Sequence, residues 1–304
     1  MATDIAKGAV TSHEVSQPEG PLRSFWRYFR ENRGAVFGMW VLIFIVAVAL
    51  FAPLIAPHDP LEQYRGFSKL PPAWFSNGDS RFLLGTDAVG RDMLTRLMYG
   101  ARISLFIGVS VMSVSMVVGV ALGLSTAWFG GIFDVIVVRI MDLIVSIPSL
   151  VLAILIMAVL EPSLTNTIVA VTIIYLPRYV RLVRASAQGE LLKDYVTAAK
   201  VSGVGPFRLM TKTVFPNCAA PLIVQGALGI SDGILEASGL GFLGLGAQPP
   251  MPEWGAMLAD SREFISAAPW IMMMPGLAIL ITVLCINLVG DGLRDALDPK
   301  LKRS

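Results

Sequence analysis

The sequence predicts an all-α membrane protein with six transmembrane helices. Its 304 residues are 55% hydrophobic and only 15% charged, and the mean hydropathy is +0.68. A chain this apolar cannot bury its hydrophobic residues and still cover itself with polar surface in water. Residues 36–57, 103–129 and 264–290 each contain no charged residue. A helix of about 20 apolar residues spans a hydrocarbon core about 30 Å thick, so each run predicts one transmembrane helix.

The N-terminal 35 residues predict a cytoplasmic arm that holds a short amphipathic helix. Arg23, Arg27, Arg30 and Arg33 recur at three- and four-residue spacing with aromatic residues between them. Such a helix suits an anionic membrane surface. Residues 36–57 then form the first predicted span, which is too long and too far from the first residue for a cleaved signal peptide.

Residues 58–100 are polar and contain several prolines, and they predict a periplasmic loop. The last part of this loop predicts a separate helix along the outer membrane surface. Thr86 or Asp87 is expected to cap that helix, and apolar residues from Met93 to Met98 lie on one of its faces.

Residues 101–291 predict the transmembrane core, which a cytoplasmic tail at 292–304 follows. The third span is expected to run continuously through Pro148, and the glycine-rich run at 237–255 is expected to be irregular. Five spans are predicted in this core. The first two lie at residues 103–129 and 133–160, and the third runs from the turn at 161–166 to about residue 179. The fourth runs from about residue 216 to the glycine-rich run, and the fifth lies at residues 264–290.

The distribution of lysine and arginine predicts which side of the membrane each loop occupies. The N-terminal arm, the segment 178–215 and the C-terminal tail together hold 16 of the 24 basic residues. Basic residues gather on the cytoplasmic side of membrane proteins. Both termini and this segment are therefore expected in the cytoplasm.

A polar and basic segment from Asp194 to Asn217 separates two apolar stretches and predicts a docking element for a partner. Its basic residues also fit a simpler role on anionic lipid. The apolar Phe207, Leu209 and Met210 favour a partner. Within a coupling loop at 181–215 and the proline after it, the candidate contact residues are Thr197, Ala198, Ala199, Gly203, Val204, Gly205, Pro206, Phe207, Arg208, Leu209, Met210 and Pro216.

Ionisable residues inside predicted spans are candidates for a translocation path, because a charge in the bilayer is costly. Asp232 and Glu236 share a helix face at four-residue spacing, and Arg139 and Asp142 lie three residues apart. For Glu236 a polar path and a structural ion pair are equally open. For Arg139 and Asp142 an ion pair, or an arginine that reaches the interface, is favoured.

Other signals exclude several classes of protein. The GxGxxG pattern at Gly239, Gly241 and Gly244 lacks the βαβ context of a dinucleotide site and predicts close backbone packing at a helix end. No GxxxxGK[ST] motif is present, so no ATP site of that kind is expected. His13 and His58 are expected to be solvated or interfacial. No metal site, catalytic constellation or cofactor site is expected, and a net charge of +2 does not suggest a nucleic-acid partner. The two cysteines are expected to be reduced core residues.

Four separated segments resemble, in order, the C-type permease subunits of ABC importers for dipeptides and oligopeptides. The general family pattern in the docking loop is Glu-Ala-Ala, three residues, Gly, nine residues, Ile-x-Leu-Pro; here Thr197 replaces the glutamate and Thr213 the isoleucine. The resemblance runs from about Phe25 to the end, and its segments are LLGTDAVGRDMLTRLMYGARISL (83–105), DYVTAAKVSGVGPFRLMTKTVFPN (194–217), LGFLGLGAQPPMPEWGAML (240–258) and NLVGDGLRDALDPKLK (287–302).

This resemblance implies a type I importer fold in the bacterial inner membrane. It implies a heterodimer with a homologous B-type permease, two cytoplasmic ATPases that bind ATP and Mg²⁺, a periplasmic peptide-binding protein and a peptide substrate. A short helix around residues 203–210 is then expected to sit in a groove of one ATPase, and Pro216 with the adjoining span to transmit its motion. The alternative is a self-sufficient secondary transporter or channel, but no internal repeat typical of such proteins is visible.

Overall fold

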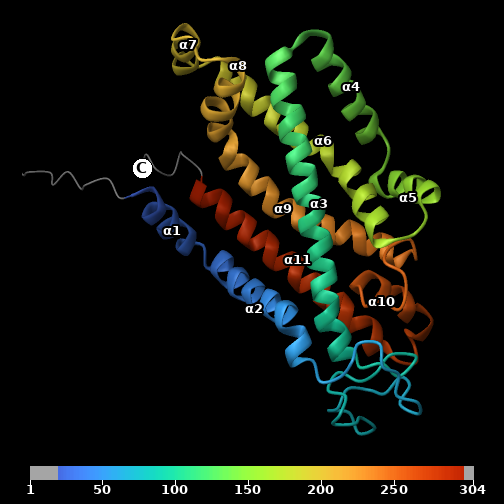
Figure 1. The fold of residues 1–304 in the computed structure, drawn as a ribbon. Coiled ribbons are helices and arrows are strands. Elements are labelled where there is room, and N and C mark those ends of the chain that lie inside the picture. Colours follow the sequence, from blue (N-terminus) through green and yellow to red (C-terminus); the bar gives the residue numbers. More distant parts are fainter. Residues whose placement is uncertain (1–19, 298–304) are drawn as a thin grey trace, which may run out of the picture.

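The computed structural model describes residues 20–297, and every regular element in this range is a helix. The long helices lie side by side in a slanted bundle, with an irregular loop at residues 56–92 at one end and α7 and α8 at the other (Figure 1). In chain order the elements are α1 (Pro21–Glu31), α2 (Arg33–Ile55), α3 (Met93–Phe129), α4 (Gly131–Ser146), α5 (Ser149–Leu160), α6 (Leu164–Leu191), α7 (Asp194–Val201), α8 (Pro206–Arg208), η1 (Leu209–Val214), η2 (Phe215–Cys218), α9 (Ala219–Phe242), α10 (Trp254–Ser261), η3 (Arg262–Phe264) and α11 (Pro269–Leu297).

Four helical stretches among the described residues are long and apolar enough to cross a membrane. They are α2, α3, the stretch Pro206–Phe242 and α11, and a fifth is added if α4 and α5 form one broken span. Helix α6 has 28 residues but carries three arginines in its second half, so its composition does not place it among them. The protein is a multi-pass helical membrane protein, and the count of six spans stays a prediction.

The predicted amphipathic helix is present as α1, and it packs against the end of α11. Phe29 is buried with Ala35 and Ala296. A Cβ atom on Gly292 of α11 would lie 2.2 Å from the Ala35 Cβ, so this contact requires glycine. The predicted run of four arginines is divided between two helices. Asn32 caps α2 by accepting a hydrogen bond from the Ala35 N–H, and Arg33 is the first residue of α2. His13 and the tail after residue 297 lie outside the described residues.

The predicted surface helix before the second span is wrong, because residues 93–129 form one helix of 37 residues. Its cap is Asp92, whose Oδ2 accepts hydrogen bonds from the Thr95 N–H (3.1 Å) and hydroxyl (2.6 Å). Thr86 and Asp87 instead stabilise the preceding loop. No proline interrupts the run after Asp92, so the helical pattern continues directly into the apolar span.

The third predicted span is not continuous, because it breaks at Pro148. Helices α4 and α5 meet there at an angle of 98°. Proline lacks an N–H and disfavours helical geometry at the residue before it, and Ile147 accordingly is extended, at φ −96° and ψ 133°. The sequence contained this signal, and the apolar composition on both sides of Pro148 concealed it.

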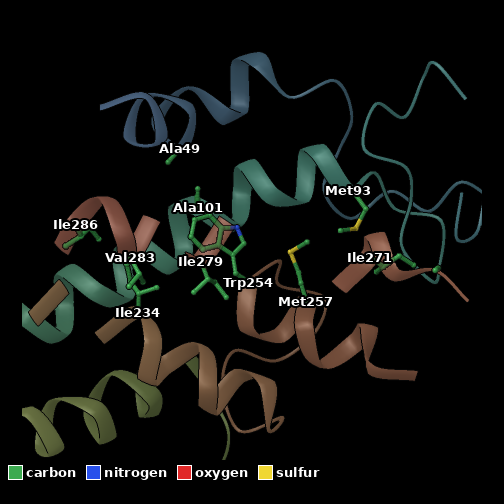
Figure 2. Close-up of a cluster of buried hydrophobic side chains, with 11 residues drawn as sticks. Ala49, Met93, Ala101, Ile234, Trp254, Met257, Ile271, Ile279, Val283 and Ile286 are labelled. Atoms are coloured by element: carbon green, nitrogen blue, oxygen red, sulfur yellow. The ribbon is translucent and has the colours of Figure 1, made fainter. Parts of the chain in front are cut away.

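The largest apolar core joins α2, α3, α9, α10 and α11 near the end that holds residues 56–92 (Figure 2). Trp254 of α10 is inserted beside α3, where its indole N–H donates to the Leu97 carbonyl at 3.1 Å. The labelled side chains of this core are Ala49, Met93, Ala101, Ile234, Trp254, Met257, Ile271, Ile279, Val283 and Ile286.

Helices α3 and α6 approach closely because α3 presents glycines to α6. A Cβ atom on Gly119 would lie 2.4 Å from the Tyr179 Cβ, and one on Gly123 would lie 2.7 Å from the Val183 Cβ. In lipid, helices associate through close packing and not through expulsion of water, so small residues at such contacts are stabilising.

We expect Gly119→Ala to destabilise the protein by about 1–3 kcal/mol, because the added methyl group forces α3 and α6 apart. Thermal unfolding of the purified protein in detergent measures this. Gly189→Ala is the matched control, because Gly189 is also helical and a Cβ there meets nothing within 4 Å. That control should be neutral or slightly stabilising. Equal melting temperatures for the two variants would contradict the packing argument.

The glycine-rich run is more regular than the sequence predicted. Gly239 and Gly241 belong to the last turns of α9, and the chain turns only at Gly244, where φ is +80°. A Cβ atom on Gly241 would lie 2.7 Å from the Glu253 Oε2 and 3.0 Å from the Gly255 carbonyl carbon. These contacts confirm close packing at a helix end for Gly241 alone, because a Cβ atom on Gly239 or Gly244 would meet nothing within 4 Å.

Glu253 fixes α10 against α3 and α9. It is almost completely buried and caps α10, with Oε1 accepting from the Gly255 N–H and Oε2 from the Ala256 N–H, both at 2.8 Å. The Ser104 hydroxyl of α3 donates to Oε1 at 3.3 Å. Loss of such a cap costs about 0.5–2 kcal/mol, so we expect Glu253→Ala to lower the melting temperature clearly and Glu253→Gln to lower it less.

The pH dependence of this carboxyl has a definite sign. Burial raises the pKa of Glu253, although the N–H groups of Gly255 and Ala256 oppose the rise. The folded chain therefore holds this proton more tightly than the unfolded chain, and ionisation reduces stability as pH rises through the raised pKa. We expect any loss of melting temperature in Glu253→Gln to be smaller at pH 8 than at pH 5. A larger loss at pH 8 would contradict this.

Candidate functional site

The predicted docking segment is a compact helical unit at the end of the bundle opposite residues 56–92 (Figure 1). Helix α7 ends at Val201, and the chain turns at Gly203, where φ is +78° and glycine is favoured. Pro206 then occupies the first turn of α8, where its missing N–H costs nothing. The helix predicted around residues 203–210 therefore has different bounds: it begins only at Pro206, after the turn at Gly203, and it continues beyond Met210.

One side of this segment is buried against the bundle. Leu209 is fully buried, and Met210 and Val214 are also buried, together with Val196 of α7. Leu124 and Trp128 at the end of α3 pack against this cluster. The structure therefore does not place Leu209 and Met210 on a common exposed face with Phe207. They hold the segment on its own subunit.

The other side of the segment is exposed and mixes apolar with basic residues. Phe207 is 82% exposed, and Val201 at the end of α7 is exposed to a similar degree. Large apolar side chains this exposed in a polar segment mark a contact surface. Of the other predicted residues, Thr197, Ala198, Gly203, Gly205, Pro206, Arg208 and Pro216 are exposed, and Ala199 and Val204 are half-buried.

The segment continues into α9 without a break. Residues Pro206–Phe242 form one helical stretch of 37 residues, in which α8 passes through a π-helical turn and a 3-10 turn into α9. Pro216 lies in the first turn of that 3-10 helix. The exposed Phe207 therefore sits at one end of a rod whose other half carries Asp232 and Glu236.

Three arginines of α6 form ion pairs with acids of two other helices. Arg178 Nη1 lies 2.5 Å from Asp232 Oδ2 on α9, and Arg181 Nη2 lies 2.7 Å from Asp142 Oδ1 on α4. Both pairs are partly exposed. The third pair, between Arg184 and Asp134 of α4, has two short contacts and is the least exposed of the three. It ties α4 to α6.

Of the two interpretations favoured for Arg139 and Asp142, the ion pair between them is wrong, and an arginine that reaches the interface stays a prediction. Asp142 pairs with Arg181, and Arg139 is exposed and forms no ion pair within residues 20–297. Sequence reasoning also missed the three arginines as partners and placed Arg178 at the edge of a loop. Their spacing of three residues puts the arginines on nearly one face of α6, but the sequence does not show which helices that face meets.

Glu236 lies one turn beyond Asp232 on α9, on the same face. Its Oε1 is buried and accepts no hydrogen bond from any described residue. Tyr175 on α6 belongs to the same buried cluster as Ala237, the residue after Glu236. The guanidinium of Arg178 lies 5.0 Å above the Tyr175 ring. The sequence therefore identified the two acids of this cluster but not its basic and aromatic members.

A cavity of about 390 Å³ lies between the α4–α5 break and α6. Its lining includes Pro148 at the break and Tyr175, Arg178 and Arg181 on α6. The basic groups of α6 therefore face both the acids and an open space. The described residues contain no group of three or more His, Cys, Asp or Glu side chains that could hold a metal ion.

At the opposite end, His58 is more enclosed than the sequence predicted. Its ring stacks on Phe82 and meets the edge of Tyr64, and its Nδ1 lies 3.2 Å from Asp92 Oδ2. The loop folds back on itself, so residues distant in sequence surround the histidine. Cys218 and Cys285 are both buried free cysteines, as expected.

These features define a helical membrane protein with a separate helical segment at one end of its bundle, and comparisons identify the family. The sequence model described as "Binding-protein-dependent transport system inner membrane component" matches residues 119–303, and "N-terminal TM domain of oligopeptide transport permease C" matches residues 20–72. The fold is similar to a structure titled as inward-facing conformations of the MetNI methionine ABC transporter, with a TM-score of 0.57 and 19% identity, over 68% of this chain and 98% of that one.

Curated relatives agree over nearly the whole chain. The chain is 53% identical to the di/tripeptide transport system permease protein DppC of Pseudomonas aeruginosa (strain UCBPP-PA14), over 93% of this chain and 94% of that protein. It is 50% identical to the dipeptide permease DppC of Haemophilus influenzae (94% and 97%) and 52% identical to that of Escherichia coli K12 (99% and 100%). The chain therefore belongs to the family of binding-protein-dependent transport system inner membrane components.

Proposed function

We propose that this chain is the C-type permease subunit of an ATP-driven importer of dipeptides and other short peptides. The proposal of cargo is supported by the relatives named as dipeptide or di/tripeptide permeases, which match nearly the full length. The alternative of a self-sufficient secondary transporter or channel is not favoured, because the family transports together with binding proteins.

We infer that the exposed side of α7 and α8 is the surface that contacts an ATPase subunit. The observation that carries this inference is Phe207, which is 82% exposed at the head of a helical stretch that reaches Phe242 without a break. The buried Leu209 and Met210 fix this head to α3. A displacement of Phe207 by the ATPase would therefore move both the bundle and the part of α9 that carries Asp232 and Glu236.

The same proposal includes the partners and the orientation. A homologous B-type permease would complete the path, two ATPases would hold ATP and Mg²⁺, and a peptide-binding protein would deliver cargo at the end with residues 56–92. The distribution of basic residues supports a cytoplasmic location for α7, α8 and both termini. This chain itself needs no cofactor and performs no hydrolysis in this scheme.

Reconstitution tests the proposal. The chain is co-expressed with the B-type permease and the two ATPases of its own organism, purified as a complex and placed in proteoliposomes with the binding protein. Labelled dialanine should accumulate only when ATP and Mg²⁺ are on the ATPase side. Accumulation by the isolated chain under a proton or sodium gradient, without ATP, would overturn the proposal.

A further inference from the structure

The Arg178–Asp232 pair is poorly explained as a stabilising contact. Arg178 is 57% and Asp232 29% exposed, and ion pairs this accessible contribute little to stability. Asp232 nevertheless lies in the stretch Pro206–Phe242, which is long and apolar enough to cross a membrane, and charged groups in such stretches are costly and mark substrate paths. The guanidinium is also held over the Tyr175 ring, so its position is defined from two directions.

Glu236 adds a second carboxylate whose hydrogen-bonding capacity is only partly used. Its buried Oε1 accepts no hydrogen bond from the described residues, whereas each oxygen of the almost completely buried Glu253 accepts at least one. A buried acceptor without a donor is destabilising. Asp232 and Glu236 are one helical turn apart, so a ligand with several donors could reach both.

The adjoining cavity has the size of a site for a small ligand. Its volume of about 390 Å³ falls in the usual range of about 300–1,000 Å³ for such sites. Arg178 lines this cavity and also reaches Asp232, so it connects the open space to the acidic face of α9. The cavity is open because the chain bends by 98° at Pro148.

We propose that Arg178, Asp232 and Glu236 form a binding site for both charged ends of a short peptide, which we call the station. The guanidinium of Arg178 releases Asp232 and binds the peptide carboxylate in its place, through two parallel hydrogen bonds. The released Asp232 and the Glu236 Oε1 then accept hydrogen bonds from the peptide ammonium, which has three donors. The station rests on the proposed function, because it assigns peptide binding within the permease itself.

The test measures peptide binding to the complete permease–ATPase complex in nanodiscs, without the binding protein and without ATP. Saturation-transfer difference NMR compares dialanine with dialanine amide, which lacks the carboxylate, and with N-acetyl-dialanine, which lacks the ammonium. We expect each blocked peptide to bind at least about tenfold more weakly. Arg178→Gln should remove the preference for the free carboxylate, and Glu236→Gln the preference for the free ammonium.

Two variants separate binding from folding. Arg178→Lys keeps the positive charge but loses the two parallel hydrogen bonds, so it should retain only part of the preference for a carboxylate. Arg184→Gln, which breaks the separate pair with Asp134, should leave both preferences unchanged. Equal binding of the three peptides, no binding of dialanine at 10 mM, or unchanged preferences in Arg178→Gln and Glu236→Gln would overturn the station. If one of these results is found but the complete transporter still takes up dialanine with ATP, only the station is rejected and the proposed function is kept. If the transporter takes up no dialanine, the proposed function itself is rejected.

Discussion

Phe207→Asp is expected to reduce peptide-stimulated ATP hydrolysis by the complete transporter at least about tenfold. The ring of Phe207 is 82% exposed, so its replacement leaves the fold of this subunit intact. At an interface, loss of a buried aromatic anchor typically costs 2 kcal/mol or more, and a buried unpaired carboxylate adds to that cost. The measurement is the ATPase rate of the reconstituted complex with and without loaded binding protein.

Two further variants separate loss of contact from loss of fold. Phe207→Leu keeps an apolar side chain and should retain most of the coupling. Leu209→Asp places a charge in the fully buried cluster beside α3, so it should lower the amount and the melting temperature of the protein. Normal stimulation in Phe207→Asp, or a fall in melting temperature as large as that of Leu209→Asp, would contradict the docking surface.

Asp87→Ala should cause the largest loss of stability, about 3–5 kcal/mol. Asp87 Oδ2 lies 2.5 Å from the Arg91 Nε and 3.5 Å from the Arg96 Nε, and the Arg96 side chain is only 2% exposed. Removal of one partner of a buried ionic group leaves an uncompensated charge, which accounts for a cost of about 3–5 kcal/mol. Asp260 compensates only in part, because its side chain is 42% exposed and its Oδ2 lies 3.6 Å from the Arg91 Nη2. An apparent melting temperature lower by roughly 5 °C or more is expected.

A surface pair at the same end of the molecule provides the control. Arg81 donates hydrogen bonds to Asp79 and holds the pKa of that carboxyl at about 2, but the Arg81 side chain is largely exposed. Asp79→Ala should therefore leave the melting temperature unchanged. Asp87→Asn removes the negative charge but keeps the turn, because the amide oxygen can still accept hydrogen bonds from the N–H groups of Val89 and Arg91. This variant therefore distinguishes the effect of the charge from that of the turn. Equal melting temperatures for Asp79→Ala and Asp87→Ala would refute the argument.

Much of the fold was predictable because apolar composition and close glycine packing are local signals. The charge-free runs predicted α2, most of α3 and most of α11, and the basic residues predicted α1. The break at Pro148 was missed because the composition on both sides continues as if one helix crossed it. The cap at Asp92 was missed because three neighbouring residues, Thr86, Asp87 and Asp92, are all good caps and only the loop fold distinguishes them.

The partners of the intramembrane acids could not be read from the sequence. Asp142 and Arg181 are 39 residues apart, and Asp232 and Arg178 are 54 residues apart. Their pairing depends on the way α4 and α9 pack against α6, and local spacing does not encode this. The division of the docking segment into buried Leu209 and exposed Phe207 likewise depends on where α3 ends. Residues two apart on a helix point in different directions, but only the packing decides which is covered.

We expect the unbroken stretch from Pro206 to Phe242 to act as a lever. Its 37 residues measure about 55 Å at a rise of 1.5 Å per residue. A tilt of about 5° around its midpoint moves its two ends by roughly 2 Å in opposite directions, without a change in its internal hydrogen bonds. The far arm carries Gly241, whose close contact with Gly255 leaves no room for slippage. A small displacement beside Phe207 therefore reaches α10, on the other side of the bundle, as a rigid-body movement.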